Sequence, residues 1–185
     1  MNMIALLPLA CFASTALASP IAYTLEGVAD GSLAGVTFAD TAFTITLTGD
    51  TDDIFDNDAG HRTILDSAAT IDIAGITTGA IFTPLMSLVA VDTTDLLVFG
   101  NWDTDLALIV MDETGFDGYA LGAPYGPITD LSPGAVFQFT NIGTSAGSVS
   151  FTQMDSVTFS ATAIPSPASL ATLSLAGLVA SRRRR

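Results

Sequence analysis

The sequence predicts an all-β protein: an antiparallel β-sandwich or jelly-roll-like single domain, flanked by an N-terminal signal peptide and a short C-terminal hydrophobic helix. Short stretches in which Thr, Val, Ile and Phe alternate recur between Gly, Asp, Asn and Pro, a pattern typical of half-buried strands joined by tight turns. The clearest stretch, Phe43-Thr44-Ile45-Thr46-Leu47, is apolar on one face and carries threonine on the other. No repeat of about 20 to 50 residues is visible, which argues against a solenoid or a propeller.

About ten strands are expected, packed as two antiparallel sheets. The stretch from Leu106 to Met111 has no polar member and is predicted to be a central strand that is buried on both sides. In chain order the expected strands cover residues 21–28, 36–47, 69–73, 80–82, 87–91, 96–99, 106–111, 135–140, 148–153 and 156–162.

Residues 1–18 have the order of a signal peptide. An apolar stretch from Ile4 to Ala13 leads to Ala16-Leu17-Ala18, an A-x-A cleavage signature. A lipoprotein is the alternative, because Leu9-Ala10-Cys11 resembles the end of a lipobox. If the signal peptide is removed, Cys11 leaves with it, and residues 19–163 form a body of one-domain size that is held by its core without disulfides.

Residues 164–185 have three parts: a Pro-x-Pro element, an apolar run and an arginine-rich end. This order resembles the PEP-CTERM sorting tail of Gram-negative envelope proteins, with Ser166 in the place where that family usually has Glu. The resemblance implies recognition by an exosortase-type membrane protease-transpeptidase, and a final location that is secreted, at the cell envelope or the extracellular surface. The residues that carry it are Pro165, Ser166, Pro167, Ala168, Ser169, Arg182, Arg183, Arg184 and Arg185.

The length of the apolar run bears on how the tail meets a membrane. From Ala168 to Ser181 it would measure about 21 Å as a helix, against a hydrocarbon core of about 30 Å. It is therefore short for a permanent transmembrane helix, although arginines on the cytoplasmic side could hold it in the membrane before processing. The alternative is an ordinary C-terminal core helix. Whether the tail is cleaved or kept as an anchor stays open at this point.

The acidic and the basic residues are separated along the chain. Residues 19–163 hold all 19 acidic residues and a single basic one, Arg62, and there is no lysine. Such a surface repels phosphate backbones, so nucleic acid is not expected as a partner. It suits divalent cations or high ionic strength, and a saline habitat explains it as well as specific ion binding does.

An aspartate-rich segment from Gly49 to Gly60 offers the clustered oxygen ligands that Ca²⁺ prefers. It differs from an EF-hand loop, because His61 stands where the bidentate Glu would be. The alternative is a plain acidic loop between strands, since Asp and Asn favour turns. Calcium is the one cofactor that the sequence suggests, with Asp50, Asp52, Asp53, Asp56 and Asp58 as candidate ligands, while Arg62 is an expected partner for the nearby aspartates.

A sugar-binding surface is the second candidate site. Trp102, the sole tryptophan, lies among polar residues, and Tyr119 and Tyr125 lie in the Gly/Pro-rich segment from Gly115 to Gly134. An aromatic face beside carboxylates suits a sugar ring. The alternative is that Trp102 closes one end of the sandwich as part of the core.

The residues for catalysis are few, since His61 is the only histidine and no nucleophile motif lies near it. We therefore expect no enzyme, although two carboxylates would suffice for glycoside hydrolysis. The expected function is that of a non-enzymatic structural or adhesive protein of the cell surface or extracellular matrix, associated with exopolysaccharide or a biofilm. The alternative is a calcium-assisted carbohydrate-binding module.

Overall fold

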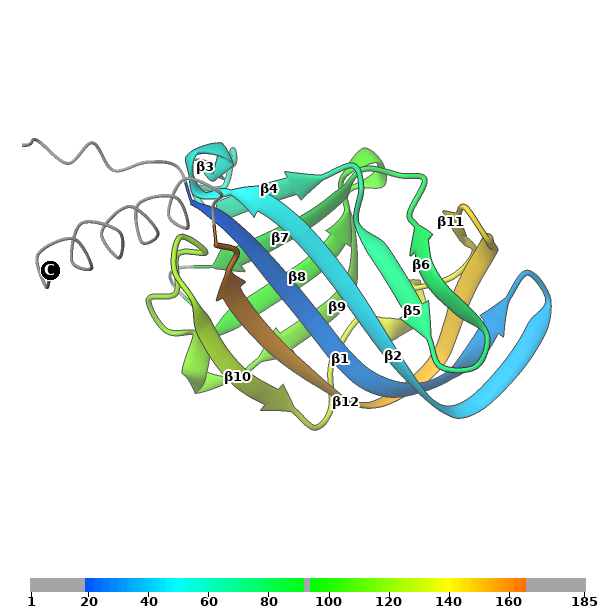
Figure 1. Ribbon diagram of the computed structural model, residues 1–185. Helices are drawn as coiled ribbons and strands as arrows, with labels where there is room; N and C mark the ends of the chain where they lie inside the picture. The colour runs from blue at the N-terminus through cyan, green and yellow to red at the C-terminus, as the bar shows by residue number, and fades with distance from the viewer. Residues whose placement is uncertain (1–18, 92–93, 166–185) are drawn as a thin grey trace, which may run out of the picture.

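The alternation around Phe43 belongs to a long hairpin of β1 (Pro20–Leu33) and β2 (Val36–Asp50). Ala34 and Gly35 connect the two strands with φ of 50° and 85°, the left-handed conformation that a tight hairpin turn requires. Strand β12 (Gly147–Ala163) pairs with the other side of β1 along almost its whole length. These three long strands run side by side through the large sheet (Figure 1). The computed structural model describes residues 19–91 and 94–165.

Two antiparallel sheets pack face to face, so the predicted all-β sandwich is confirmed. The larger sheet has seven strands in the order β10-β12-β1-β2-β5-β6, with β11 also paired to β12. The smaller sheet has the order β3-β4-β7-β8-β9. The remaining strands are β3 (Phe55–Asp56), β4 (Arg62–Asp66), β5 (Thr70–Ile73), β6 (Thr77–Ile81), β7 (Met86–Val91), β8 (Leu96–Asn101), β9 (Leu106–Asp112), β10 (Tyr125–Asp130) and β11 (Ile142–Thr144).

Four 3₁₀ turns join these strands. They are η1 (Thr51–Asp53), η2 (Trp102–Thr104), η3 (Thr114–Phe116) and η4 (Val136–Gln138).

Aromatic rings fill the space between the sheets. Phe139 lies within 4.5 Å of Phe151 and 6.3 Å of Phe82, measured between ring centroids. A second group surrounds Phe159, whose ring contacts Phe116 and Tyr119 at 5.7 Å each. Burial of such rings is the main favourable contribution to folding in a protein without disulfides.

Strand β2 of the large sheet and strand β4 of the small sheet lie close together at Gly49. A Cβ atom at this position would lie 2.3 Å from Cδ1 of Ile64 in β4, too close for any side chain unless Ile64 moves. Ile64 is itself buried in the core. The glycine at the start of the aspartate-rich segment therefore lets β4 of the small sheet pack against β2 of the large one.

The expected strand at residues 135–140 is wrong, because η4 occupies its centre. Ala135 and Asn141 have φ of 61° and 54°, so the chain turns at both ends of this segment instead of extending. Phe139 is fully buried and contacts rings of both sheets. The apolar residues that suggested a strand serve to insert this ring into the core.

The predicted central position of residues 106–111 is also wrong. β9 is the edge strand of the smaller sheet, and Leu106 is 40% exposed. Its middle is nevertheless buried on both faces, since the consecutive residues Leu108 and Ile109 are fully buried, and Val110 and Gly134 exchange two backbone hydrogen bonds of 3.0 and 2.7 Å at the edge. An edge strand can thus consist of apolar residues when both of its faces are buried and its free edge is covered by another segment, here at Gly134.

The two stretches expected at 148–153 and 156–162 form one continuous strand, β12. Its pairing with β1 shifts register near Ala29 and Gly31, close to the gap that was expected between the two stretches. Strands β3, β4, β10 and β11 were not predicted. β10 contains Pro127, and β4 begins with the charged Arg62, so both lack the signals of a sheet interior.

Both ends of the described chain lie together. Ile21 pairs with Ala163, and the Ile164 amide donates to the Pro20 carbonyl at 2.8 Å. Among residues 19–91 and 94–165 no helix is long and apolar enough to cross a membrane. The predicted signal peptide, residues 1–18, and the tail from Ser166 to Arg185, including its expected transmembrane helix, lie outside the described residues; Pro165 is the last residue described.

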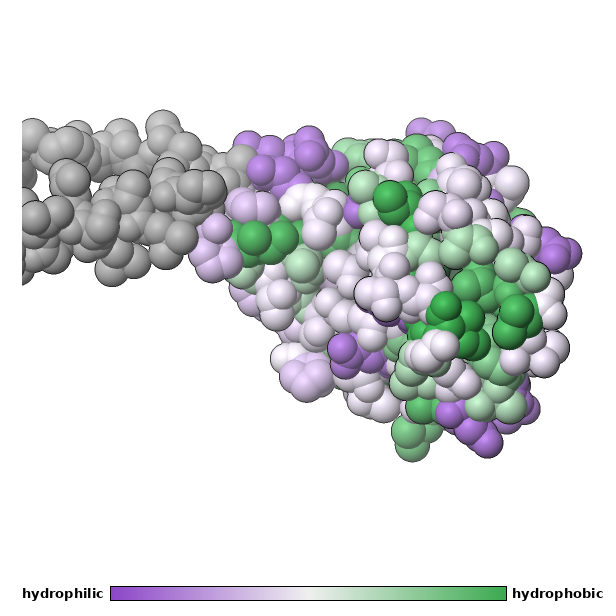
Figure 2. All heavy atoms as spheres, turned by 45° about the vertical axis from the view of Figure 1, so that its right-hand side comes forward, coloured by the Kyte–Doolittle hydropathy of each residue, from purple (hydrophilic) through white to green (hydrophobic). Residues whose placement is uncertain are grey.

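Several large apolar side chains of the described residues remain exposed. Figure 2 shows apolar atoms gathered on the side of the sandwich that Figure 1 draws at its right, where β6 and β11 lie. Phe137 in η4 is the most exposed, at 79%. Two exposed aromatic residues, Phe55 and Trp102, differ from the others because they pack against each other.

Candidate functional site

The aspartate-rich segment folds as a 3₁₀ turn, a two-residue strand and a tight turn. The Asp50 carboxylate accepts a hydrogen bond of 3.1 Å from the Asp52 amide and so caps η1. Ile54 packs against the core, which fixes the segment to the body. In the following turn the side-chain oxygen of Asn57 accepts hydrogen bonds of 3.0 Å from the amides of Ala59 and His61. Asp and Asn thus build much of this loop from their own side chains.

The structure does not gather the five candidate calcium ligands into one set. Among the described residues no group of three or more His, Cys, Asp or Glu side chains is placed to hold a metal ion. The Asp56 carboxylate instead pairs with the Nε atom of Arg62 at 3.4 Å, which confirms the expected partner for that arginine. Calcium binding therefore stays a prediction.

Trp102 lies in η2, the turn between β8 and β9, which many hydrogen bonds hold in place. Its amide donates to the Leu85 carbonyl at 2.8 Å, while the Leu85 amide donates to the Asp103 carboxylate at 2.9 Å. The Asn101 side chain caps the turn by accepting from the Asp103 amide at 3.1 Å. The backbone that carries Trp102 is therefore fixed from both sides, although the side chain itself is 38% exposed.

The Trp102 ring meets the Phe55 ring at a right angle. The two centroids are 6.0 Å apart, the planes make an angle of 89°, and Phe55 is 37% exposed. The rings come from the two-residue strand β3 and from η2, which directly follows β8, so the sandwich brings together segments that are far apart in the sequence. They form an exposed aromatic corner, which we define as Phe55 and Trp102.

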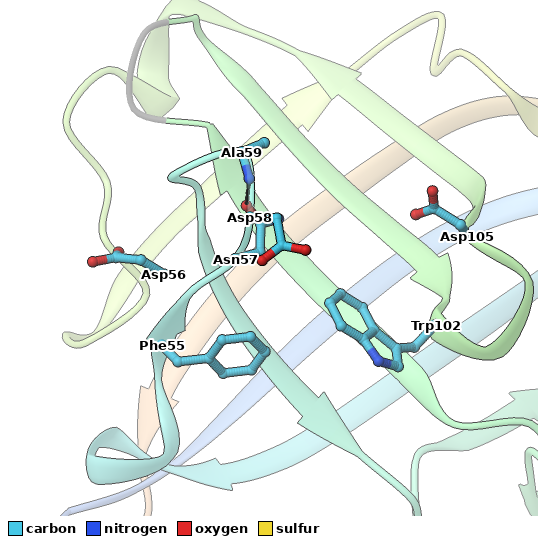
Figure 3. Close-up of a pocket in the computed structure, with 7 residues that line it drawn as sticks. All are labelled: Phe55, Asp56, Asn57, Asp58, Ala59, Trp102 and Asp105. Carbon is cyan, nitrogen blue, oxygen red and sulfur yellow. Dashed lines mark hydrogen bonds between the residues drawn. The ribbon is translucent and has the colours of Figure 1, made fainter.

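A hollow of about 610 Å³ opens beside the aromatic corner (Figure 3). In Figure 3 the Asp58 carboxylate points toward the space between the two rings, while the Asp56 carboxylate points away from it. The lining residues are Phe55, Asp56, Asn57, Asp58, Ala59, Trp102 and Asp105. Carboxylate and amide groups thus lie next to aromatic faces, as in many carbohydrate sites.

A second, smaller hollow of about 150 Å³ adjoins the first. Both are lined by Asn57, Trp102 and Asp105, and the smaller one continues over β7 and β8 past Ser87 and Asn101. Trp102 therefore stands between two adjoining depressions, a shape that suits an elongated ligand better than a single small one.

Comparisons with known proteins give no information about this hollow. No family model matches the chain. Searches of curated proteins and of solved structures found no match either.

The two predicted tyrosines do not line the hollow. Tyr119 is buried, and its ring stacks on that of Tyr125 with the centroids 4.3 Å apart. The Tyr119 hydroxyl donates to the Ala123 carbonyl at 3.3 Å, and the Tyr125 hydroxyl donates to the Gly115 carbonyl. Burial raises the pKa of Tyr119, and the neighbouring Tyr23 and Tyr125 raise it further. Both hydroxyls thus bond to carbonyls within the Gly/Pro-rich segment itself and fix its internal shape.

Phe55, Asn57 and Asp105 are lining residues that the sequence did not single out. The one available signal was Phe55, the single aromatic residue within a run of aspartates, where a solvated loop gives no reason for a large ring. The neighbours of Trp102 in the sequence were noted as polar, but nothing in them indicated which would face a ligand.

Proposed function

We propose that this chain is a secreted, non-enzymatic protein of the bacterial cell surface or extracellular matrix, and that its aromatic corner binds polysaccharide. The observation that carries the proposal is the hollow in which Phe55 and Trp102 stand at 89° beside Asn57 and Asp58. Sugar rings stack on aromatic faces through their C–H groups, while their hydroxyls bond to amides and carboxylates.

The second hollow supports a polymeric ligand. A chain of sugars that stacks on Trp102 could extend over β7 and β8, where Ser87 and Asn101 offer polar groups. The residues that line the two hollows belong to the small sheet and its connecting turns. Such an arrangement suits a protein that attaches to a matrix.

The sorting part of the proposal is supported by the tail motif and the charge distribution. The Pro165-Ser166-Pro167 element and Arg182 to Arg185 favour recognition by an exosortase-type enzyme, with the tail in the membrane before processing. The body carries one basic residue against 19 acidic ones, which disfavours nucleic acid as a partner.

The test is a glycan array with the secreted domain, followed by titration calorimetry on any glycan that binds. Trp102→Ala and Phe55→Ala should each weaken binding about tenfold or more, since both rings form the corner. Phe137→Ala is the matched control, because it removes an exposed aromatic ring that lies outside the hollow. Binding that survives both corner substitutions would contradict the proposed site.

A further inference from the structure

We propose that the hollow prefers a sugar with a positively charged amine, so that the polysaccharide it binds contains unacetylated amino sugars. This inference rests on the proposed function and adds the chemical class of the ligand. It starts from the carboxylates around the aromatic corner, with which a neutral sugar would form no ion pair.

The first observation is an imbalance of charge in the lining. Asp56, Asp58 and Asp105 contribute three carboxylates, and Arg62 is the only basic side chain in residues 19–163 other than His61. Arg62 pairs with Asp56. Within the described residues neither Asp58 nor Asp105 has an ion-pair partner. The hollow therefore presents uncompensated negative charge to a ligand.

The second, independent observation is the geometry of the rings. A cation is attracted to the face of Trp or Phe when it lies within about 6 Å of the ring centroid. The two rings meet edge to face at 89° with centroids 6.0 Å apart, so a cation in the hollow beside this contact can lie near both rings. Because the Asp58 carboxylate points toward the space between the two rings, an ammonium group placed there would lie near both rings and a carboxylate (Figure 3).

The same features disfavour acidic sugars. A uronic acid or sulfated sugar would bring its negative charge next to Asp58, on a body that already repels anions. An N-acetylated sugar can stack on the rings but carries no charge for the carboxylate. An amino sugar satisfies the aromatic faces and the charge together, which makes it the best match to this hollow.

The experiment compares a hexamer of β-1,4-linked glucosamine with its fully N-acetylated counterpart, since the two differ only in the amine. Dissociation constants are measured by calorimetry on the secreted domain at pH 5.5, where the amines of the sugar are protonated. We expect the glucosamine hexamer to bind about tenfold more tightly at low salt, and the ratio to shrink in 0.5 M NaCl.

Asp58→Asn should reduce the ratio toward one while leaving affinity for the N-acetylated hexamer unchanged. Asp40→Asn is the matched control, because it removes the same charge from an exposed position in β2 and should preserve the ratio. Equal binding of the two hexamers by the unsubstituted protein would overturn this inference and leave the proposed function standing. If no glycan binds, the two hexamers included, both the inference and the proposed function are overturned. Both are also overturned if choline binds and no glycan does, because the ligand would then be a cation without a sugar.

Discussion

The carboxylate of Asp66 in β4 accepts a hydrogen bond of 2.7 Å from the Thr48 amide in β2, and so links the two sheets. Its other oxygen accepts from the Ala68 amide at 2.6 Å. Asp130 repeats the arrangement: as the last residue of β10 it accepts from the Asp112 amide in β9 at 3.1 Å and from the Ser132 amide at 2.8 Å. Two buried aspartates, each ending a strand, thus connect the sheets in the same way.

Replacing Asp66 should therefore cost far more stability than replacing an exposed aspartate. Asp66→Ala leaves two backbone N–H groups without their acceptor, and we expect the free energy of unfolding to fall by about 2–4 kcal/mol. Asp66→Asn keeps one acceptor oxygen and should cost less. Urea denaturation followed by tryptophan fluorescence measures both, with the exposed Asp53→Ala as control. Equal midpoints for Asp66→Ala and the control would show that the link contributes nothing.

A buried tyrosine connects another distant pair. The Tyr23 hydroxyl in β1 donates to the Leu121 carbonyl at 2.9 Å, across 98 residues of sequence. This bond ties the Gly/Pro-rich segment to β1, whereas the hydroxyls of Tyr119 and Tyr125 bond within the segment. Burial raises the pKa of Tyr23 above the value of 10.0 that an exposed tyrosine has.

The raised pKa of Tyr23 predicts a loss of stability in alkali. Below pH 10 the hydroxyl is neutral in both the folded and the unfolded chain, so its stabilising contribution is complete. Above pH 10 the unfolded chain loses the proton first, so the free energy of unfolding should fall as pH rises toward the pKa of the folded state. Denaturant titrations between pH 8 and 11.5 measure this decline. Tyr23→Phe should lower stability by about 1 kcal/mol at pH 7 but make the alkaline decline shallower; an unchanged slope would contradict the assignment.

The fold could be predicted because its strands carry their pattern locally. Phe43 to Leu47 alternates as a strand with one buried face must, and β1, β2, β7 and β8 were expected close to where they lie. The failures have physical causes. The rings of residues 135–140 serve as a core insertion, and β4 and β10 contain a charge or a proline that only the neighbouring strands make acceptable.

The candidate site was predictable only in part. Trp102 was singled out, but its partner Phe55 depends on sheet order, because β4 and β7 lie between β3 and β8. The same limit applies to the aspartates. Asp66 and Asp130 link the two sheets, whereas Asp58 lines the hollow. The sequence alone does not distinguish these three aspartates. Burial and orientation separate them, and both follow from the register of the strands.

The calcium prediction can be separated from simple charge screening. Calcium added to metal-stripped protein should raise the thermal midpoint more than NaCl of equal ionic strength does. At a calcium concentration a hundredfold above Kd, the gain in the free energy of unfolding should be about 2.7 kcal/mol. Asp52→Ala and Asp56→Ala should abolish the difference. Because Asp56 is paired with Arg62, binding should also change the environment of that pair. Equal shifts from both salts, at every concentration, would leave only the screening of a polyanion.

The tail makes a prediction about mass. If the exosortase-type processing holds, the mature protein ends near Pro165 and has lost Arg182 to Arg185, which are four of its five basic residues. Intact mass spectrometry of the protein from native cells measures this directly, and Arg182→Ala with Arg183→Ala should let the unprocessed form accumulate. Since Ser166 replaces the usual Glu, Ser166→Glu should speed processing if the enzyme reads that position, whereas Thr162→Glu, at an exposed position of β12 before the motif, should not. Mature surface protein that retains all four arginines would rule out cleavage and favour an anchored tail, held at the end of the sandwich where Ile164 bonds to Pro20.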